Sequence, residues 1–242
     1  MVVVEPGTFQ YQLFFALTGV ILIVKAILAI YLGRRVWQKK KEAGKLVPDF
    51  LFGIFIFMIS LFISRIFFAY FDFVLTQFDV DRYHLYPNVL YWKLGMFTSA
   101  IGIAITIFIM DKSVLRFKFK GILSYIIIAG AIFVVIYPVN TAEDFAFVSG
   151  ISIFSMVGTL LIPILFIYIA IKTPGLRTVS LMITFGFIFY GVASLLVNEA
   201  ILTQFRILFG AEIHILIFFL FMILKITGLS MVSYAVTKFG LR

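Results

Sequence analysis

Seven long apolar stretches, separated by short polar or charged segments, fill almost the whole chain. They lie at about residues 11–33, 50–77, 89–110, 121–138, 146–171, 178–202 and 212–236. Most of them reach the ~20 residues that a helix needs to cross a bilayer. Each is apolar around its whole circumference instead of along one stripe, which argues against a soluble bundle. The pattern predicts an all-α membrane protein, with residues 1–242 forming a single seven-helix transmembrane bundle.

The composition agrees with a membrane protein and argues against several kinds of catalytic and metal-binding site. Hydrophobic residues make up 63% of the chain and charged residues 13%, against about 25% charged residues in soluble domains. The chain has no cysteine, so it has no disulfide, no thiolate metal site and no cysteine nucleophile. It also lacks the zinc-protease, serine-hydrolase and phosphate-binding motifs. We therefore expect no enzyme activity, no catalytic residues, no bound metal and no cofactor.

Positive charge gathers in alternate connections between the apolar stretches. The first, third and fifth connections and the tail carry Arg34, Arg35, Lys39, Lys40, Lys41, Lys45, Lys112, Arg116, Lys118, Lys120, Lys172, Arg177, Lys238 and Arg242, and the others carry Arg82, Lys93 and Arg206. Lys and Arg mark the cytoplasmic side, so we expect a cell-membrane protein with its N-terminus outside and its C-terminus inside. The basic loops are expected to rest on anionic headgroups of the bilayer, with an acidic partner protein as the alternative and nucleic acid excluded.

Three cations fall near the middle of predicted spans: Lys25, Arg65 and Lys225. A charge at the bilayer centre costs ~2.5–3.5 kcal/mol on insertion scales, so each needs a reason. The first, second and seventh spans would be neighbours, and the cations would then face one cavity for a small anionic or polar ligand. Asp72 is the carboxylate of this candidate ligand site. It lies two helical turns from Arg65, about 10 Å along the axis, which predicts a bridging water or hydroxyl instead of a direct ion pair. The alternative is that Lys25 snorkels toward the headgroups and the other two bond carbonyls or water.

Other residues suggest sites only weakly. Lys225 sits mid-way along the seventh span, where retinal proteins carry their Schiff base, but the third span offers no carboxylate counter-ion, so we expect no retinal. His84 and His214 are interpreted as surface histidines and not as zinc ligands. Trp92 is expected to anchor a span end at the membrane interface. Asn198 is expected to cap the sixth span, with an external pocket as the alternative.

The region from the second span to the third carries a family resemblance. It reads Ser-Arg-Ile-Phe-Phe-Ala-Tyr-Phe-Asp-Phe from Ser64, and, after a short loop, Val-Leu-Tyr-Trp-Lys-Leu-Gly-Met-Phe-Thr-Ser-Ala-Ile-Gly-Ile from residue 89. This resembles the seven-helix sensor region at the N-terminus of many archaeal and bacterial histidine kinases. The positions that match the habit of that family are Asp72, Tyr91, Trp92, Lys93 and Gly102. The resemblance implies a receptor-like module. No kinase domain follows the seventh span, so a separate cytoplasmic partner is expected to receive the signal.

The sequence thus favours a receptor- or sensor-like membrane protein for an unidentified small ligand. Two other classes stay open. One is a transporter or lipid-handling protein for an anionic or polar substrate. The other is a subunit of a larger membrane complex. Accumulation of ligand in sealed vesicles would mark a transporter, and a stable companion in mild detergent would mark a subunit.

The charge asymmetry predicts the side of the membrane on which each end of the chain lies. A tag fused after Arg242 should be protected from added protease in intact cells, because cytoplasmic connections carry the excess of Lys and Arg. A tag fused before Met1 serves as the control and should be removed. Cleavage of the C-terminal tag in intact cells would show that the orientation is wrong.

Overall fold

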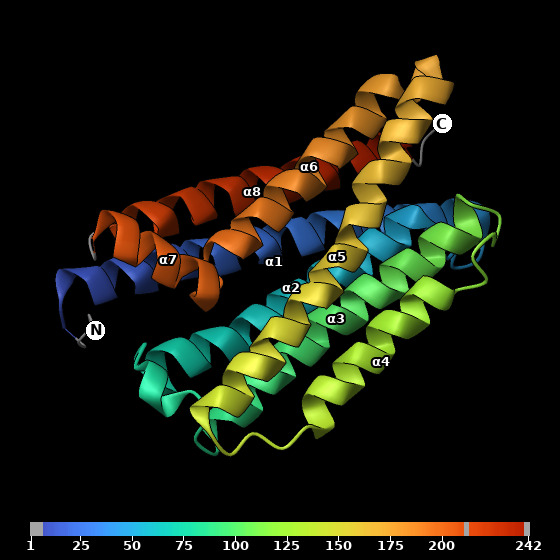
Figure 1. Cartoon of the computed structure of the whole chain (residues 1–242). Helices are drawn as coiled ribbons and strands as arrows, with labels where there is room; N and C mark the ends of the chain where they lie inside the picture. Colours follow the sequence, from blue (N-terminus) through green and yellow to red (C-terminus); the bar gives the residue numbers. More distant parts are fainter. Residues whose placement is uncertain (1–6, 211–212, 240–242) are drawn as a thin grey trace.

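The computed structural model describes residues 7–210 and 213–239, except for the side chains of residues 152–159, 199, 200, 203 and 206. Throughout this part of the chain, all regular secondary structure is helical (Figure 1). The α-helices are α1 (Phe9–Ala43), α2 (Phe50–Ala69), α3 (Asn88–Ser113), α4 (Ile122–Ile136), α5 (Ala142–Lys172), α6 (Arg177–Leu196), α7 (Glu199–Phe209) and α8 (Ile213–Phe239). A π-helix, η1 (Tyr70–Leu75), continues α2, and two short 3-10 turns, η2 (Val80–Arg82) and η3 (Pro174–Leu176), lie in connections.

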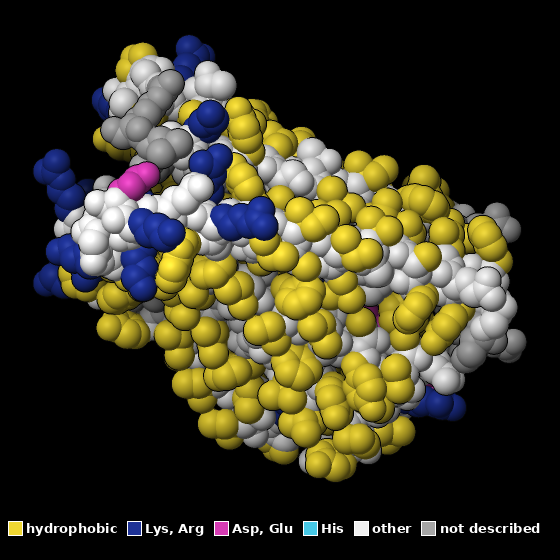
Figure 2. All heavy atoms as spheres, turned by 180° about the vertical axis from the view of Figure 1, so that it is seen from behind, with side chains coloured by type: hydrophobic (Ala, Val, Ile, Leu, Met, Phe, Trp, Pro, Cys, Tyr) yellow, Lys and Arg dark blue, Asp and Glu magenta, His cyan; other side chains and the backbone are white. Residues whose placement is uncertain are grey.

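The helices are those of a multi-pass membrane protein. Five segments of the described chain are long and apolar enough to cross a bilayer: Phe9–Ala43, Phe50–Thr76, Asn88–Ser113, Pro174–Leu196 and Ile213–Phe239. The α4 helix has 15 residues, about 22 Å at 1.5 Å per residue, and is shorter than a usual span. Apolar side chains cover a broad surface of the molecule (Figure 2), including Ile23, Ile126, Ile164 and Leu216, each of which is about 60% exposed. Such a surface is compatible with lipid and not with water.

Two helices differ in extent from the predicted spans. The first span was placed at 11–33, but α1 continues to Ala43, so Arg34, Arg35 and the lysines after them lie on its last turns. Lys, Arg, Gln and Glu are good helix formers, and hydropathy does not register them. The sixth span was placed at 178–202, but α6 ends at Leu196 and a separate helix, α7, follows.

The helices form two groups joined by α5. The first group is α6 and α8, and the second is α2, α3 and α4, while α1 packs against both α2 and α8 (Figure 1). The α5 helix runs obliquely across both groups and contacts α3, α4 and α6. The predicted neighbourhood of the first, second and seventh spans is confirmed, because α1, α2 and α8 contact one another.

The two ends of the bundle differ in charge and packing. We call the end with the α1–α2, α3–α4 and α5–α6 connections the basic end, because Lys and Arg gather there (Figure 2). The other end is called the far end. Apolar side chains fill the basic half, where the Phe50 ring lies 5.0 Å from that of Phe166 and 6.2 Å from that of Phe239. Among the described residues, the basic half is therefore packed with apolar side chains.

Charged side chains hold both ends of α4 against α3. Asp111, which is buried on α3, accepts hydrogen bonds from the backbone N–H groups of Phe119 (3.0 Å) and Gly121 (2.8 Å), just before α4 begins. Lys93, also on α3, donates to two carbonyl oxygens at the end of α4, that of Tyr137 at 2.6 Å. Lys93 was predicted as a connection charge, but it is buried and caps a helix C-terminus, where a cation is favourable.

A close helix contact joins α6 to α8 at two glycines. A methyl group added at Gly228 would lie 2.6 Å from the carbonyl oxygen of Gly186 and 2.9 Å from the backbone nitrogen of Tyr190. Small residues of this kind let membrane helices approach closely. The crossing lies within one turn of Lys225 on α8, so it sets the position of a cavity residue described below.

Gly228→Ala should therefore destabilise the bundle. The added methyl meets backbone atoms that have little room to move, and overpacking of this kind costs ~1–3 kcal/mol. The midpoint of thermal unfolding in detergent should fall. Gly130→Ala on α4 is the matched control, because an added Cβ there meets nothing within 4 Å. An equal response of the two variants would contradict the close crossing.

Candidate functional site

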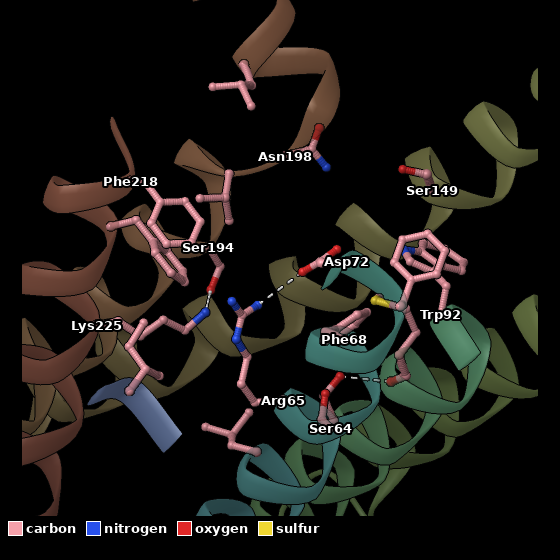
Figure 3. Close-up of a pocket in the computed structure, with 18 of the residues that line it drawn as sticks. Ser64, Arg65, Phe68, Asp72, Trp92, Ser149, Ser194, Asn198, Phe218 and Lys225 are labelled. Carbon is pink, nitrogen blue, oxygen red and sulfur yellow. Dashed lines mark hydrogen bonds and ion pairs between the residues drawn. The ribbon is translucent and has the colours of Figure 1, made fainter. Parts of the chain in front are cut away.

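A cavity of about 280 Å³ lies in the far half of the bundle, between the two helix groups. Residues of α1, α2, η1, α3, α5, α6, α7 and α8 line it, and it reaches Tyr83 in the α2–α3 connection. All four predicted ligand-binding residues, Lys25, Arg65, Asp72 and Lys225, are in its wall. The structure therefore brings together side chains of α1, α2, η1 and α8. Figure 3 shows Arg65, Asp72 and Lys225 of this set.

Lys25 lines the cavity from α1. Its side chain is 4% exposed, and Nζ donates a 2.9 Å hydrogen bond to the carbonyl oxygen of Leu61 on α2. The residue therefore points into the bundle, and the alternative that it snorkels toward the headgroups is wrong. Leu61 lies one turn before Arg65, so its carbonyl faces the same cavity.

Arg65 and Asp72 form a direct ion pair, which the sequence interpretation had excluded. Arg65 NH1 lies 3.7 Å from Asp72 Oδ2 (Figure 3). The predicted separation along the axis ignored the side chains. Helical side chains lean toward the N-terminus, so Asp72 leans back toward the long arginine. Asp72 also lies in the π-helix Tyr70–Leu75, a feature that is frequent at functional sites in membrane and soluble helices.

Arg65 has further partners but is not saturated. Its NH2 group donates to the hydroxyl of Thr18 on α1 at 2.8 Å, and its guanidinium lies 5.9 Å from the centre of the Phe221 ring. Its Nε is buried and makes no hydrogen bond within the described structure. A guanidinium presents five N–H donors, so this group retains capacity for an acceptor.

Lys225 is held by a hydroxyl and by aromatic rings. Its Nζ donates to Ser194 Oγ at 2.9 Å, and Ser194 in turn donates to the carbonyl oxygen of Tyr190 at 3.0 Å. The same ammonium lies 4.7 Å from the centre of the Tyr190 ring and 4.9 Å from that of Phe221. These are cation–π distances. The sequence analysis gave backbone carbonyls or water as alternative partners of Lys225, and it did not predict the serine hydroxyl or the aromatic rings.

Several wall residues were missed or misread from the sequence. Trp92, expected at the interface, lines the cavity, with its ring 4.9 Å from that of Phe145. His214, expected on the surface, is 8% exposed and packs against the Phe14 ring at 4.8 Å. Asn198 lines the cavity, so the alternative of an external pocket was the better one. Each of these residues stands at a helix end, where hydropathy does not tell which way a side chain points.

The start of α5 shows how the local sequence positions part of the wall. Thr141 Oγ1 accepts the N–H of Asp144, and the Asp144 carboxylate accepts the N–H groups of Asn140 and Thr141. This capping box fixes the first turn of α5, and Phe145 and Ser149 follow it into the cavity wall. The hydrogen bonds from Asn140 and Thr141 lower the pKa of Asp144 below its ordinary value.

Chemically, the cavity offers cations and aromatic faces. Three Lys or Arg side chains and a single carboxylate are found among its described lining residues. Within the described residues, no cluster of three or more His, Cys, Asp or Glu side chains is placed to hold a metal ion. The arrangement is suited to binding an anion, because positive charge exceeds negative charge in a site with an apolar wall.

No protein-family model matches the chain, and no curated protein or solved structure is detectably similar to it.

Removal of Asp72 should destabilise the protein more than removal of a loop carboxylate. Asp72→Ala leaves Arg65 less compensated, and we expect a loss of about 1–3 kcal/mol, below the ~3–5 kcal/mol of a fully buried pair. The pair falls short of that because its side chains are 13% and 20% exposed. Thermal unfolding in detergent measures the loss.

Asp81→Ala is the control, since Asp81 is exposed. Asp79 is unsuitable because it accepts the N–H of Asp81 and pairs with Arg82. The double variant Arg65→Leu with Asp72→Leu should recover part of the loss. Additive single effects, as small as that of Asp81→Ala, would show that the two residues are independent.

Proposed function

We propose that the protein is a receptor- or sensor-like membrane protein that binds a small ligand in the far-half cavity and signals to a separate cytoplasmic protein. The observation that carries this proposal is the cavity itself. Charged side chains of α1, α2 and α8 converge there, and it stops at the packed basic half. Intramembrane charges of this kind are costly and usually functional.

The proposed topology is seven spans, with the N-terminus outside the cell membrane and the C-terminus inside. It is supported by the position of the basic connections at one end of the bundle (Figure 2), in line with the excess of Lys and Arg on the cytoplasmic side. In this topology α4 and α5 are the fourth and fifth spans. The large side chains of α4 that face outward are mostly apolar, including Ile122, Ile126, Phe133 and Ile136. A local thinning of the bilayer would accommodate its length.

The proposed signal is a change in the packing between the two helix groups. A ligand in the cavity would contact Arg65 on one group and Lys225 on the other, so its binding energy depends on how far apart the groups lie. The far half contains the cavity, whereas apolar side chains fill the basic half. The two helix groups would therefore pivot about the filled half. A small shift at the far end would then move the basic connections. Shifts of ~1–2 Å between packed helices are common in such transitions.

Transport of an anionic or polar substrate is the second candidate. Two interruptions of helix geometry border the cavity: the π-helix that carries Asp72, and the break between α6 and α7 at Asn198. Transporters use broken helices at their binding sites. The dense packing of the basic half favours the receptor, because a substrate would have to displace these described apolar side chains to leave on that side.

A distance measurement across the basic end tests whether the cavity is coupled to it. The chain has no cysteine, so Lys118→Cys and Thr173→Cys can each carry a spin label without other changes. These positions are exposed in the α3–α4 and α5–α6 connections, on different helix groups. Asp72→Asn in this background should shift or broaden the distance distribution by about 2 Å or more, because it perturbs the ion pair between α2 and η1 that faces α8.

Asp81→Asn is the matched control and should leave the distribution unchanged. Identical distributions for the parent and the Asp72→Asn protein would remove the support for signalling. Accumulation of a carboxylate in sealed vesicles, dependent on Arg65, would favour the transporter instead.

A further inference from the structure

We propose that the ligand is a small carboxylate with an apolar body, and that Asp72 occupies the place of its carboxylate when the cavity is empty of ligand. This inference rests on the proposed ligand-binding role of the cavity, and it adds the chemical class and the competing group.

The cations of the cavity are not neutralised by the carboxylate beside them. Within the described residues, neither Lys25 nor Lys225 forms an ion pair; their polar partners are a carbonyl oxygen and a serine hydroxyl. Asp72 lies 3.7 Å from Arg65. Charged hydrogen bonds are normally ~2.7–2.9 Å long, so the ion pair is loose. A second anion would relieve the unfavourable burial of like charges.

Arg65 is the group best placed to receive that anion. Its NH2 is used by Thr18 and its Nε makes no hydrogen bond in the described structure. A planar carboxylate can take two N–H groups of one guanidinium side by side. In Figure 3 the guanidinium lies between Lys225 and Asp72, so an incoming carboxylate would meet Arg65 and Lys225 together and displace Asp72.

The walls select for an apolar body behind the carboxylate. Around the charged groups the cavity is lined by Phe68, Phe71, Trp92, Phe145, Phe218 and Phe221. Such walls gain ~25 cal/mol for each Å² of apolar surface that a ligand removes from water. The volume of about 280 Å³ is near the lower limit of ligand sites, ~300 Å³. It fits a compact aromatic or short-chain acid and excludes a whole phospholipid.

Trp92 provides a direct test. The chain has two tryptophans, and Trp37 is on the exposed surface of α1, 56% exposed and far from the cavity lining. In a Trp37→Phe protein, the remaining emission reports the cavity wall. The purified full-length protein in detergent is titrated with phenylacetate and octanoate, each compared with its amide. The two acids distinguish an aromatic acid from a fatty acyl chain.

We expect saturable changes in Trp92 emission with the acids and at least tenfold weaker binding of the amides. Asp72→Asn should increase the affinity for the acids about three- to tenfold, because it removes the competing anion. Arg65→Gln should weaken it at least tenfold. Arg34→Gln is the matched control for loss of a guanidinium outside the cavity, because Arg34 is exposed near the C-terminal end of α1, and it should have no effect.

Three results would overturn the proposal. Equal binding of an acid and its amide would show that the negative charge is not recognised. Binding of chloride or sulfate as strong as that of the acids would show that the apolar body is not recognised. Weaker binding of acids by Asp72→Asn would make Asp72 part of the site instead of its competitor. The comparison of acid with amide needs no cavity variant, so it stands even where a variant does not fold.

The outcomes separate this inference from the proposed function. Binding of the acids without any change at the basic end would keep the ligand class and remove the signalling role. A change at the basic end in the Asp72→Asn protein, without binding of the acids, would keep the signalling role and remove the ligand class.

Discussion

The burial of Lys25, Arg65 and Lys225 within an apolar bundle is the constraint on which the rest of the structure depends. An ionised side chain far from water has to find polar partners, or its insertion is strongly unfavourable. The structure supplies them from different helices: Leu61 for Lys25, Thr18 and Asp72 for Arg65, and Ser194 for Lys225. These contacts tie α1 to α2 on one side of the cavity and α6 to α8 on the other.

Close packing of the helices around the cavity holds these three cations and their partners in place. The glycine crossing of α6 and α8 fixes the distance between Ser194 and Lys225, and the aromatic cluster at the basic end closes the bundle below the cavity. The same division gives the proposed receptor its two parts, a hollow half that a ligand can fill and a packed half that transmits the change. Aromatic faces around the cations make the hollow half suitable for an anion with an apolar body.

Much of the candidate site can be predicted from the sequence, because a charged residue within an apolar segment is unfavourable in a membrane and is easily recognised. Lys25, Arg65, Asp72 and Lys225 are conspicuous because charges are rare in apolar segments, and their meeting follows once α1, α2 and α8 are neighbours. The ion pair of Arg65 with Asp72 was missed because axial spacing ignores the reach and lean of side chains. Trp92 and His214 were misassigned because their direction depends on the helices packed against them, α5 for Trp92 and α1 for His214.

The sequence by itself determined the helical membrane class, the approximate place of each helix and the separation of basic from other connections. Those properties depend on local hydropathy and on charge, which each segment carries regardless of its neighbours. Only the tertiary structure decided that α6 stops before α7 and that Lys93 and Asp111 hold α4 against α3. It also decided which polar group bonds to each buried cation. Those properties depend on contacts between residues distant in the chain, such as Arg65 with Thr18 and Lys225 with Ser194, and no single segment contains that information.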